Sequence, residues 1–274
     1  MELLPPYFAA PFIGVLGLII GSFLDVIVCR FHTGKSINGR SHCMSCGHTL
    51  SWYELFPLLS YLILRGRCKE CGGHIPLRLL LMELTTAGSF IFVYLSSPSL
   101  LLLGFSLVLI ALLIVIAAYD MRHMVIPNEF VIMMSAFALL YVGFEAYIAS
   151  SLLILVPHFI AACGASLFYG GLWVVSKGRW IGLGDAKLAF PLAFMLSISG
   201  AFSFVVLSFW IGAILSIILL GSQKLLQSGK KHLPFLIQPL TMKSEVPFAP
   251  FMILAFIIVF WRHVDVLSIM TALF

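Results

Sequence analysis

Long apolar segments alternate with short polar segments along almost the whole chain. Several of the apolar runs reach the ~20 residues that a helix needs to cross a bilayer. The sixth and the eighth are short, and the sixth contains Pro191. The pattern predicts an all-α polytopic membrane protein with about eight transmembrane helices. The apolar runs cover about residues 8–28, 79–97, 99–119, 129–149, 152–175, 186–200, 201–221 and 247–261.

Composition supports lipid as the solvent for most of this chain. Of its 274 residues, 61% are hydrophobic and 10% are charged, whereas soluble domains carry roughly 25% charged residues. A water-soluble core could not enclose this much apolar surface. The function must therefore depend on the few polar side chains that the chain retains.

The basic residues predict how the chain is oriented in the membrane. If the first run starts outside the cell and ends in the cytosol, four polar segments lie on the cytosolic side. These four segments hold 15 of the 16 Lys and Arg residues, and only Arg262 lies outside. Such an excess is typical of cytosolic loops. We therefore expect an outside N-terminus, and we assign the net charge of +5 to topology and anionic lipid rather than to nucleic acid. The four inner segments are 29–78, 120–128, 176–187 and the basic loop 222–246.

The first inner segment contains two C-x-x-C motifs, 43-CMSC-46 and 68-CKEC-71, separated by 21 residues. This spacing is close to that of a zinc ribbon, although one or two residues longer than usual, and in such a ribbon four thiolates hold one tetrahedral Zn²⁺. Such a site is structural, because no position stays open for water. Two disulfides are the alternative, which the reducing cytosol disfavours. The predicted metal ligands are Cys43, Cys46, Cys68 and Cys71.

Two aspartates are candidates for catalysis. Asp120 ends the third run and Asp185 begins the sixth, so the predicted topology places both at the cytosolic face. Two close carboxylates can hydrolyse a peptide, since one activates water while the other donates a proton. Gly182 and Gly184 leave no bulky side chain beside Asp185, which would let a substrate backbone approach.

The alternative is that each aspartate only marks a solvated helix end. Asp120 would then pair with Arg122 and Asp185 with Lys187, or both would be solvated by water. A G-x-G-D motif alone does not decide between a catalytic pair and two interfacial carboxylates.

Other polar and small residues have simpler interpretations. Asp25 and Glu83 lie near the cytosolic ends of the first two runs, where pairing with Arg30 or Arg78 is expected. Gly17 and Gly21 have the small-xxx-small spacing of a helix-packing surface. The segment 247-PFAPF-251 is interpreted as an interfacial break.

Taken together, these motifs resemble the bacterial type IV prepilin peptidases, which are membrane aspartyl peptidases of the G-x-G-D type and N-methyltransferases. The resemblance covers nearly the whole chain, and its cysteine segment is the most specific part. The matching segments are 21-GSFLDVIVCR-30, 43-CMSCGHTLSWYELFPLLSYLILRGRCKECGGHI-75, 78-RLLLMEL-84, 120-DMRHMVIPN-128, 182-GLGDAKL-188 and 247-PFAPF-251.

The resemblance implies a function. Family members cleave the basic leader of prepilin or pseudopilin precursors after a glycine at the cytosolic face of the inner membrane. They then methylate the new N-terminal amine with S-adenosylmethionine. Asp120 and Asp185 match the two catalytic aspartates, with Gly182, Gly184 and Lys187 in supporting positions.

The resemblance also suggests how the chain is divided. We expect a first transmembrane helix over 1–28, a cytosolic zinc-binding module with the methyltransferase region over 29–78, and a peptidase core over 79–274. Glu83 and Arg78 are candidates to bind the methyl donor.

One position departs from the family pattern, and two other functions remain open. The family commonly has asparagine where this chain has Asp25, which adds a third carboxylate near the active face. A G-x-G-D protease with other substrates and no methylation is one alternative. A proton-coupled transporter is the other, although its ionisable groups would be expected near the midplane of the membrane.

Overall fold

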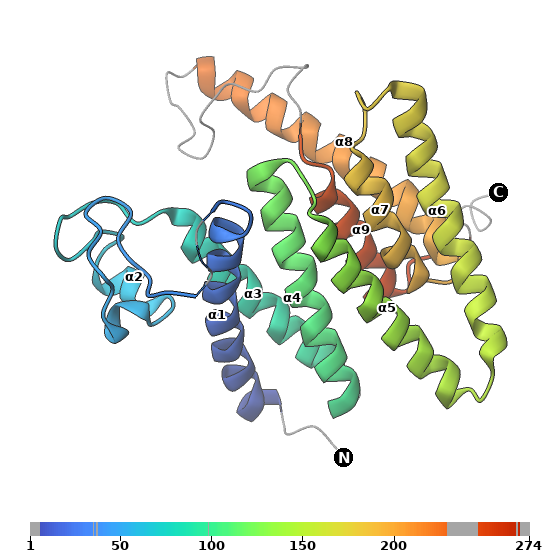
Figure 1. Ribbon diagram of the computed structural model, residues 1–274, viewed down its shortest axis with the longest axis horizontal. Helices are drawn as coiled ribbons and strands as arrows, with labels where there is room; N and C mark the ends of the chain where they lie inside the picture. Colours follow the sequence, from blue (N-terminus) through green and yellow to red (C-terminus); the bar gives the residue numbers. More distant parts are fainter. Residues whose placement is uncertain are drawn as a thin grey trace. The chain divides into compact units, whose positions relative to one another are not determined.

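The computed structural model describes residues 6–34, 36, 38–97, 99–228, 246–266 and 268. Within them the chain is mostly helical, and a helix lies at each of the apolar runs (Figure 1). The predicted all-α architecture is confirmed. These helices are α1 (Pro6–Arg30), α3 (Leu77–Ser96), α4 (Leu100–His123), α5 (Asn128–Ile148), α6 (Leu155–Ser176), α7 (Leu183–Phe194), α8 (Ile198–Ser228) and α9 (Ala249–Arg262).

The helices differ in their ability to cross a bilayer. Six of those described are long and apolar enough to do so, namely α1, α3, α4, α5, α6 and α8. Helices α7 and α9 have 12 and 14 residues, fewer than the ~20 that a spanning helix needs. Part of the predicted basic loop 222–246 belongs to α8, which continues to Ser228, and residues 229–245 lie outside the described part of the chain.

The chain divides into two compact units, Met1–Ala118 and Tyr119–Phe274. In the first unit, α1 packs against α3 at two glycines. A side-chain carbon on Gly17 would lie 2.6 Å from the Cα of Ala87, and one on Gly21 would lie 2.8 Å from the carbonyl oxygen of Met82. The predicted packing role of both glycines is confirmed, because any side chain there would separate the two helices.

The cysteine module lies between α1 and α3 in the chain. It contains the short helices η1 (Trp52–Leu55) and α2 (Leu59–Ile63) and two isolated antiparallel bridges, His42 with Thr49 and Arg67 with His74. With so little regular structure and a small apolar core, this module needs further stabilisation to hold its loops in place.

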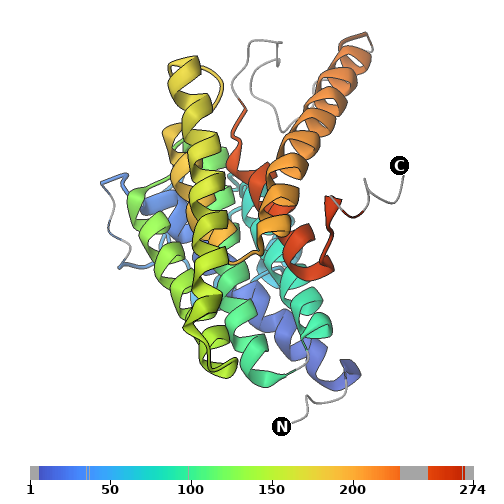
Figure 2. The same cartoon turned by 90° about the vertical axis from the view of Figure 1, so that its right-hand side faces the viewer.

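In the second unit, the short helix α7 lies at the centre. It packs against α5, α6, α8 and α9, and Figure 2 shows it beside α6, which is coloured yellow. The η2 turn (Leu152–Ile154) connects α5 to α6. Small and medium side chains let the neighbouring helices approach on several sides, so α7 is held in one position. Its fully buried residues are Leu188, Ala189, Leu192 and Ala193.

Candidate active site and cysteine cluster

Asp120 lies in the last turns of α4, in the part that belongs to the second unit. Its side chain is buried, with 5% of the residue exposed. The backbone N–H of Ala249, the first residue of α9, donates a hydrogen bond to its Oδ2 at 3.1 Å. The start of α9 therefore fixes one oxygen of this carboxyl group.

Asp185 lies in the first turn of α7 and is 7% exposed. The backbone N–H of Gly182 donates a hydrogen bond to its Oδ2 at 3.1 Å. A carboxylate in this position is favoured because the free N–H groups of the first helical turn carry partial positive charge. Asp185 is thus held in the same way as Asp120, by one main-chain donor.

The two aspartates lie close enough for the charge of Asp120 to act on Asp185. Gly184, the residue before Asp185, lies against the segment that follows α4, because a side-chain carbon there would be 3.2 Å from the Cβ of Ile126. Ile126 belongs to the segment that follows α4. The absence of a side chain at position 184 therefore allows close packing against the protein's own chain. The sequence had instead suggested that it gives access to a substrate.

Lys187 does not pair with an aspartate in this structure. Its Nζ donates a hydrogen bond to Oδ1 of Asn128 at 3.0 Å, which connects α7 to the first residue of α5. The pairing of Asp185 with Lys187, which the sequence left open, is therefore wrong.

The segment 247-PFAPF-251 contributes more than an interfacial break. Ala249 is fully buried and supplies the donor to Asp120, while the ring of Phe248 lies 6.0 Å from that of Tyr169 and 5.2 Å from that of Phe209. These aromatic contacts hold the start of α9 in place. The residue types of this segment do not indicate such a role, and its only signal in the sequence is its place among the motifs that carry the resemblance.

In the first unit, the four predicted metal ligands come together. The Sγ atoms of Cys43, Cys46, Cys68 and Cys71 all lie within 4.8 Å of one another, and all four cysteines are free. Sγ of Cys43 and Sγ of Cys71 are 3.8 Å apart, a separation that excludes a disulfide bond. A tetrahedral zinc ion with bonds of ~2.3 Å places its sulfur ligands about 3.8 Å apart. The cluster therefore fits a zinc ion.

The two cysteine motifs fold in the same way. The N–H of Gly47 donates to the carbonyl of Cys43 at 3.0 Å, and the N–H of Gly72 donates to the carbonyl of Cys68 at 2.9 Å. Both glycines have positive φ, 74° and 67°, which a side chain would disfavour. The repeated turn points two thiols of each motif toward the same centre, as the sequence predicted for a zinc ribbon.

Arg78 and Asp25 form an ion pair. Nε of Arg78 donates to Oδ1 of Asp25 at 2.9 Å, and its NH2 group donates to Oδ2 at 3.3 Å and to Sγ of Cys29 at 2.8 Å. The expected pairing of Asp25 with a nearby arginine is confirmed. The additional carboxylate of this chain therefore neutralises Arg78.

Glu83 has a different partner from the arginine expected. Its residue is 3% exposed, and its Oε2 accepts a hydrogen bond from the backbone N–H of Leu58 at 2.7 Å. Leu58 has a φ of 63°, which is unfavourable for a branched side chain. Glu83 on α3 thus fixes the strained turn that precedes α2 in the cysteine module.

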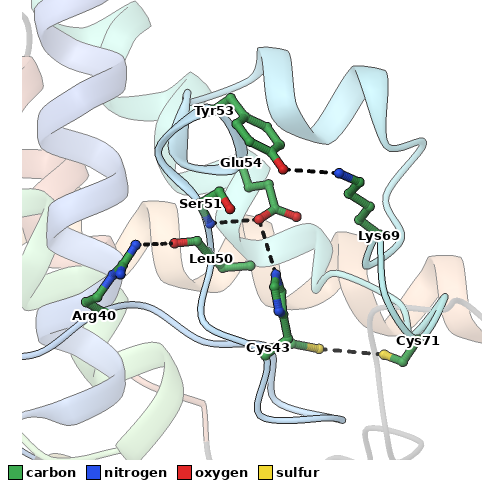
Figure 3. A network of polar contacts seen from close by, with 9 residues as sticks. Arg40, Cys43, Leu50, Ser51, Tyr53, Glu54, Lys69 and Cys71 are labelled. Carbon is green, nitrogen blue, oxygen red and sulfur yellow. Dashed lines mark hydrogen bonds and ion pairs between the residues drawn. The ribbon is translucent and has the colours of Figure 1, made fainter.

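Glu54 is a buried carboxylate that was not among the residues predicted to have a role. Its Oε2 accepts a hydrogen bond from the N–H of Ser51 at 2.7 Å and lies 3.5 Å from Nε2 of His48. Figure 3 shows Glu54 and Ser51 at the centre of a polar network in the cysteine module. The residue stands within the W-Y-E segment of the cysteine region, where an acidic residue beside aromatic ones gave no sign of burial.

Comparisons with known proteins agree on one family. Residues 15–97 match the bacterial peptidase A24 N-terminal domain, and residues 107–217 match the type IV leader peptidase family. A protein of Bacillus subtilis (strain 168) named prepilin leader peptidase/N-methyltransferase is 34% identical over 70% of this chain and 77% of its own length. This chain belongs to the type IV leader peptidase family.

Other family members of the same name extend the comparison. The protein of Myxococcus xanthus (strain DK1622) is 34% identical over 79% of this chain and 66% of its own length. The protein of Dichelobacter nodosus is 28% identical over 93% of this chain and 92% of its own length. No solved structure is significantly similar to the chain. The chain is therefore a membrane peptidase, and its two family matches cover the cysteine module and the segment with both aspartates.

Proposed function

We propose that this enzyme removes the leader of type IV prepilin or pseudopilin precursors and then methylates the new N-terminal residue. The observation that carries the peptidase part is the pair of buried aspartates, Asp120 and Asp185, each held by one main-chain N–H in the same unit. The names of the relatives support the substrate and the second activity.

Peptide hydrolysis needs the two carboxyl groups in different protonation states. Two close, buried carboxyl groups do not ionise together easily, so the pair shares a proton. The ionised member takes a proton from water, which attacks the scissile carbonyl carbon. The protonated member donates its proton to the carbonyl oxygen, and the member that took a proton from water passes it to the leaving nitrogen. Because the main-chain bonds engage Oδ2 of each aspartate, Oδ1 of each can face water and substrate.

The position of the site suits a leader peptide that arrives from the cytosol. Of the 16 basic residues, 15 lie in the segments assigned to the cytosolic side of the inner membrane. Asp120 and Asp185 lie at the ends of helices that border two of these segments. A precursor with a basic leader and an apolar helix would therefore present its cleavage point, after glycine, at the depth of the pair.

Zinc would serve the fold of the cysteine module. Cys43, Cys46, Cys68 and Cys71 would hold the ion, and four thiolates leave no position for a reacting group. The ion supplies a cross-link between the two turns, which a module with so small a core requires. The cysteines therefore act on activity through the shape of the module.

Methyl transfer would follow cleavage, with S-adenosylmethionine as donor. When bound, the donor would supply the methyl group, and a carboxylate of this chain, with Glu83 as our candidate, would accept the proton that the new amine must lose before it is methylated. Glu83 and Arg78 remain our candidates among the residues near the donor. Glu83 already orders the turn at Leu58, and Arg78 already pairs with Asp25, so both would position the site.

Mass spectrometry of a co-expressed pilin-like precursor tests both activities. We expect loss of the leader and the added mass of one methyl group with the wild type, and an intact precursor with Asp185→Asn. Loss of the leader without the methyl group would refute the second activity. An intact precursor with the wild type, in several pilin and pseudopilin backgrounds, would refute the substrate.

A further inference from the structure

The cysteine module exposes a cluster of large hydrophobic side chains between residues 52 and 63. Each member of this cluster is between 44% and 78% exposed. A contiguous apolar patch of this kind marks a site of contact with another protein or with a membrane. The members of the cluster, called here the apolar surface of the module, are Trp52, Tyr53, Leu55, Phe56, Leu59, Leu62 and Ile63.

Helix α2 has the reverse of the polarity expected for a helix at a water surface. Leu59, Leu62 and Ile63 are exposed, and their spacing of three and four residues places them on one side of the helix. The hydroxyl-bearing residues Ser60 and Tyr61 instead line a cavity between the module and the adjoining ends of α1 and α3. A helix in water turns its apolar side inward, so the outer side of α2 is suited to an apolar medium.

A hydrogen bond to α3 fixes the depth at which α2 begins. The N–H of Leu58, the residue before α2, donates to Oε2 of Glu83 at 2.7 Å. Glu83 lies six residues after Leu77, where the membrane-spanning helix α3 starts, and this separation corresponds to about 9 Å along the helix. Interfacial helices bury their apolar side about 5–10 Å into the boundary between headgroups and acyl chains. The start of α2 therefore lies beside the spanning helix at the depth of this boundary.

Aromatic side chains of the apolar surface suit the same boundary. The ring of Trp52 lies 5.9 Å from that of Tyr53 and 5.8 Å from that of Phe56. Nζ of Lys69 donates a hydrogen bond to the hydroxyl of Tyr53 at 3.1 Å (Figure 3). Tryptophan and tyrosine gather where a membrane meets water, because their rings are apolar and their polar groups reach the headgroups.

The charges next to the apolar surface favour anionic lipid. Between residues 52 and 69 every exposed charged side chain is basic, and Glu54, the one acidic residue in this range, is buried. Basic side chains at a membrane surface are attracted to anionic headgroups. The exposed basic residues are Arg65, Arg67 and Lys69.

We propose that the apolar surface of the cysteine module inserts into the lipid leaflet in which α1 ends and α3 begins, with its basic neighbours on anionic phospholipid headgroups. Lipid is favoured over a protein partner because the bond from Leu58 to Glu83 sets α2 at the depth of a spanning helix. The module is then held against the membrane by its own surface as well as by α1 and α3. The inference is independent of the proposed function, since it concerns the contact that the module makes and not the reaction it serves.

Photocrosslinking of the full-length protein in vesicles of phosphatidylcholine and phosphatidylglycerol tests the proposal. Ile63 is replaced by p-benzoylphenylalanine, and the irradiated protein is analysed by mass spectrometry, with and without a co-reconstituted precursor. We expect lipid adducts at position 63 in both samples. The matched control carries the same photoreactive residue in place of Glu70, which is exposed in the same module but outside the apolar surface, and should give few or none.

The preference for anionic lipid is tested with two basic residues. Arg65→Gln combined with Lys69→Gln should lower the ratio of phosphatidylglycerol to phosphatidylcholine adducts at position 63 by about fivefold or more, as expected for the loss of two basic groups near a membrane surface. Lys177→Gln, which removes an exposed basic residue from the second unit, should leave this ratio unchanged.

Tryptophan fluorescence gives a second measurement without a photoreactive residue. The difference in emission between the wild type and Trp52→Phe isolates the signal of Trp52. We expect this signal to be quenched by lipids with brominated acyl chains and to be protected from iodide in the water. Zinc content and unfolding temperature should match the wild type in every variant used.

Several results would overturn the proposal. One is a crosslink from position 63 to the precursor or to a second copy of the chain in place of lipid. Others are equal lipid labelling at 63 and 70, or quenching of Trp52 by iodide but not by brominated lipid. Each of these results would leave cleavage and methylation of the precursor untouched, so failure of this inference is distinct from failure of the proposed function.

Discussion

The guanidinium of Arg78 donates hydrogen bonds to both carboxylate oxygens of Asp25, at 2.9 and 3.3 Å. The two residues stand 53 positions apart in the chain and connect α1 to the first turn of α3. Bidentate pairs of this kind fix the geometry of an arginine more firmly than a single contact does.

Loss of the carboxylate at 25 should destabilise the first unit. Asp25→Leu leaves the half-buried charge of Arg78 without a counterion, and we expect a cost of about 1–3 kcal/mol in stability. Asp25→Asn should cost less, because the amide oxygen still accepts one bond. Thermal unfolding in detergent measures the stability loss of each variant. The double variant Asp25→Leu with Arg78→Met removes the unpaired charge and is the control. A double variant no more stable than Asp25→Leu alone would show that the unpaired charge is not the cause.

Replacement of either aspartate of the pair by asparagine should separate chemistry from structure. In Asp120→Asn and Asp185→Asn the amide oxygen keeps the bond from the N–H of Ala249 or Gly182, while the ionisable group is lost. We expect cleavage to fall by at least about 10²–10⁴-fold, with an unchanged unfolding temperature. The assay is the rate of leader removal from a purified precursor. Glu129→Gln, an exposed position at the start of α5, is the control, and full activity in either asparagine variant would remove that residue from the mechanism.

The contact between Gly184 and Ile126 should set the spacing of the aspartate pair. Gly184→Val forces two methyl groups against Ile126, and overpacking of this kind costs about 1–3 kcal/mol. We expect slower cleavage, with partial recovery when Ile126→Ala is added. Gly164→Val is the comparison, since a side-chain carbon at 164 would meet nothing within 4 Å. Equal loss in the two valine variants would assign the effect to the helix itself.

Removal of a cysteine from the cluster should release the metal and loosen the module. We expect one zinc ion per chain in the wild type and none in Cys68→Ser, because three thiolates bind zinc far more weakly than four. Elemental analysis gives the zinc content, and hydrogen exchange over residues 40–75 reports the loosening. Cys163→Ser, which replaces a cysteine outside the cluster, should retain both zinc and protection. A wild type without zinc but with full protection would refute the metal site.

The sequence was sufficient for features that repeat a local pattern. The apolar runs predicted the long helices, the C-x-x-C motifs predicted the cysteine cluster, and the spacing of Gly17 and Gly21 predicted a close helix contact. In each case the side-chain type itself determines the structure, through burial, metal affinity or the absence of a Cβ.

Features that depend on backbone atoms far away in the chain could not be predicted from local sequence patterns. Ala249 reaches Asp120 through its N–H, and alanine carries no sequence signal for such a bond. The sequence also did not predict that α7 ends at Phe194. The turn between Phe194 and Ile198, where α8 begins, is itself largely apolar. Burial of Glu54 depends on how the cysteine module folds over α1 and α3, which no local pattern records.

The main-chain origin of both donors to the aspartate pair has a consequence for genetics. Every amino acid except proline carries the same N–H, so substitutions at 182 and 249 can alter packing but do not delete the hydrogen bond. A mutational scan at these two positions would therefore report the effect of side-chain size and would not report the electrostatic contribution of the N–H group. Only a change to the backbone, such as an ester in place of the amide at 249, would measure what the hydrogen bond contributes. Evolutionary substitutions at these two positions, other than to proline, therefore retain the N–H donors to the two aspartates.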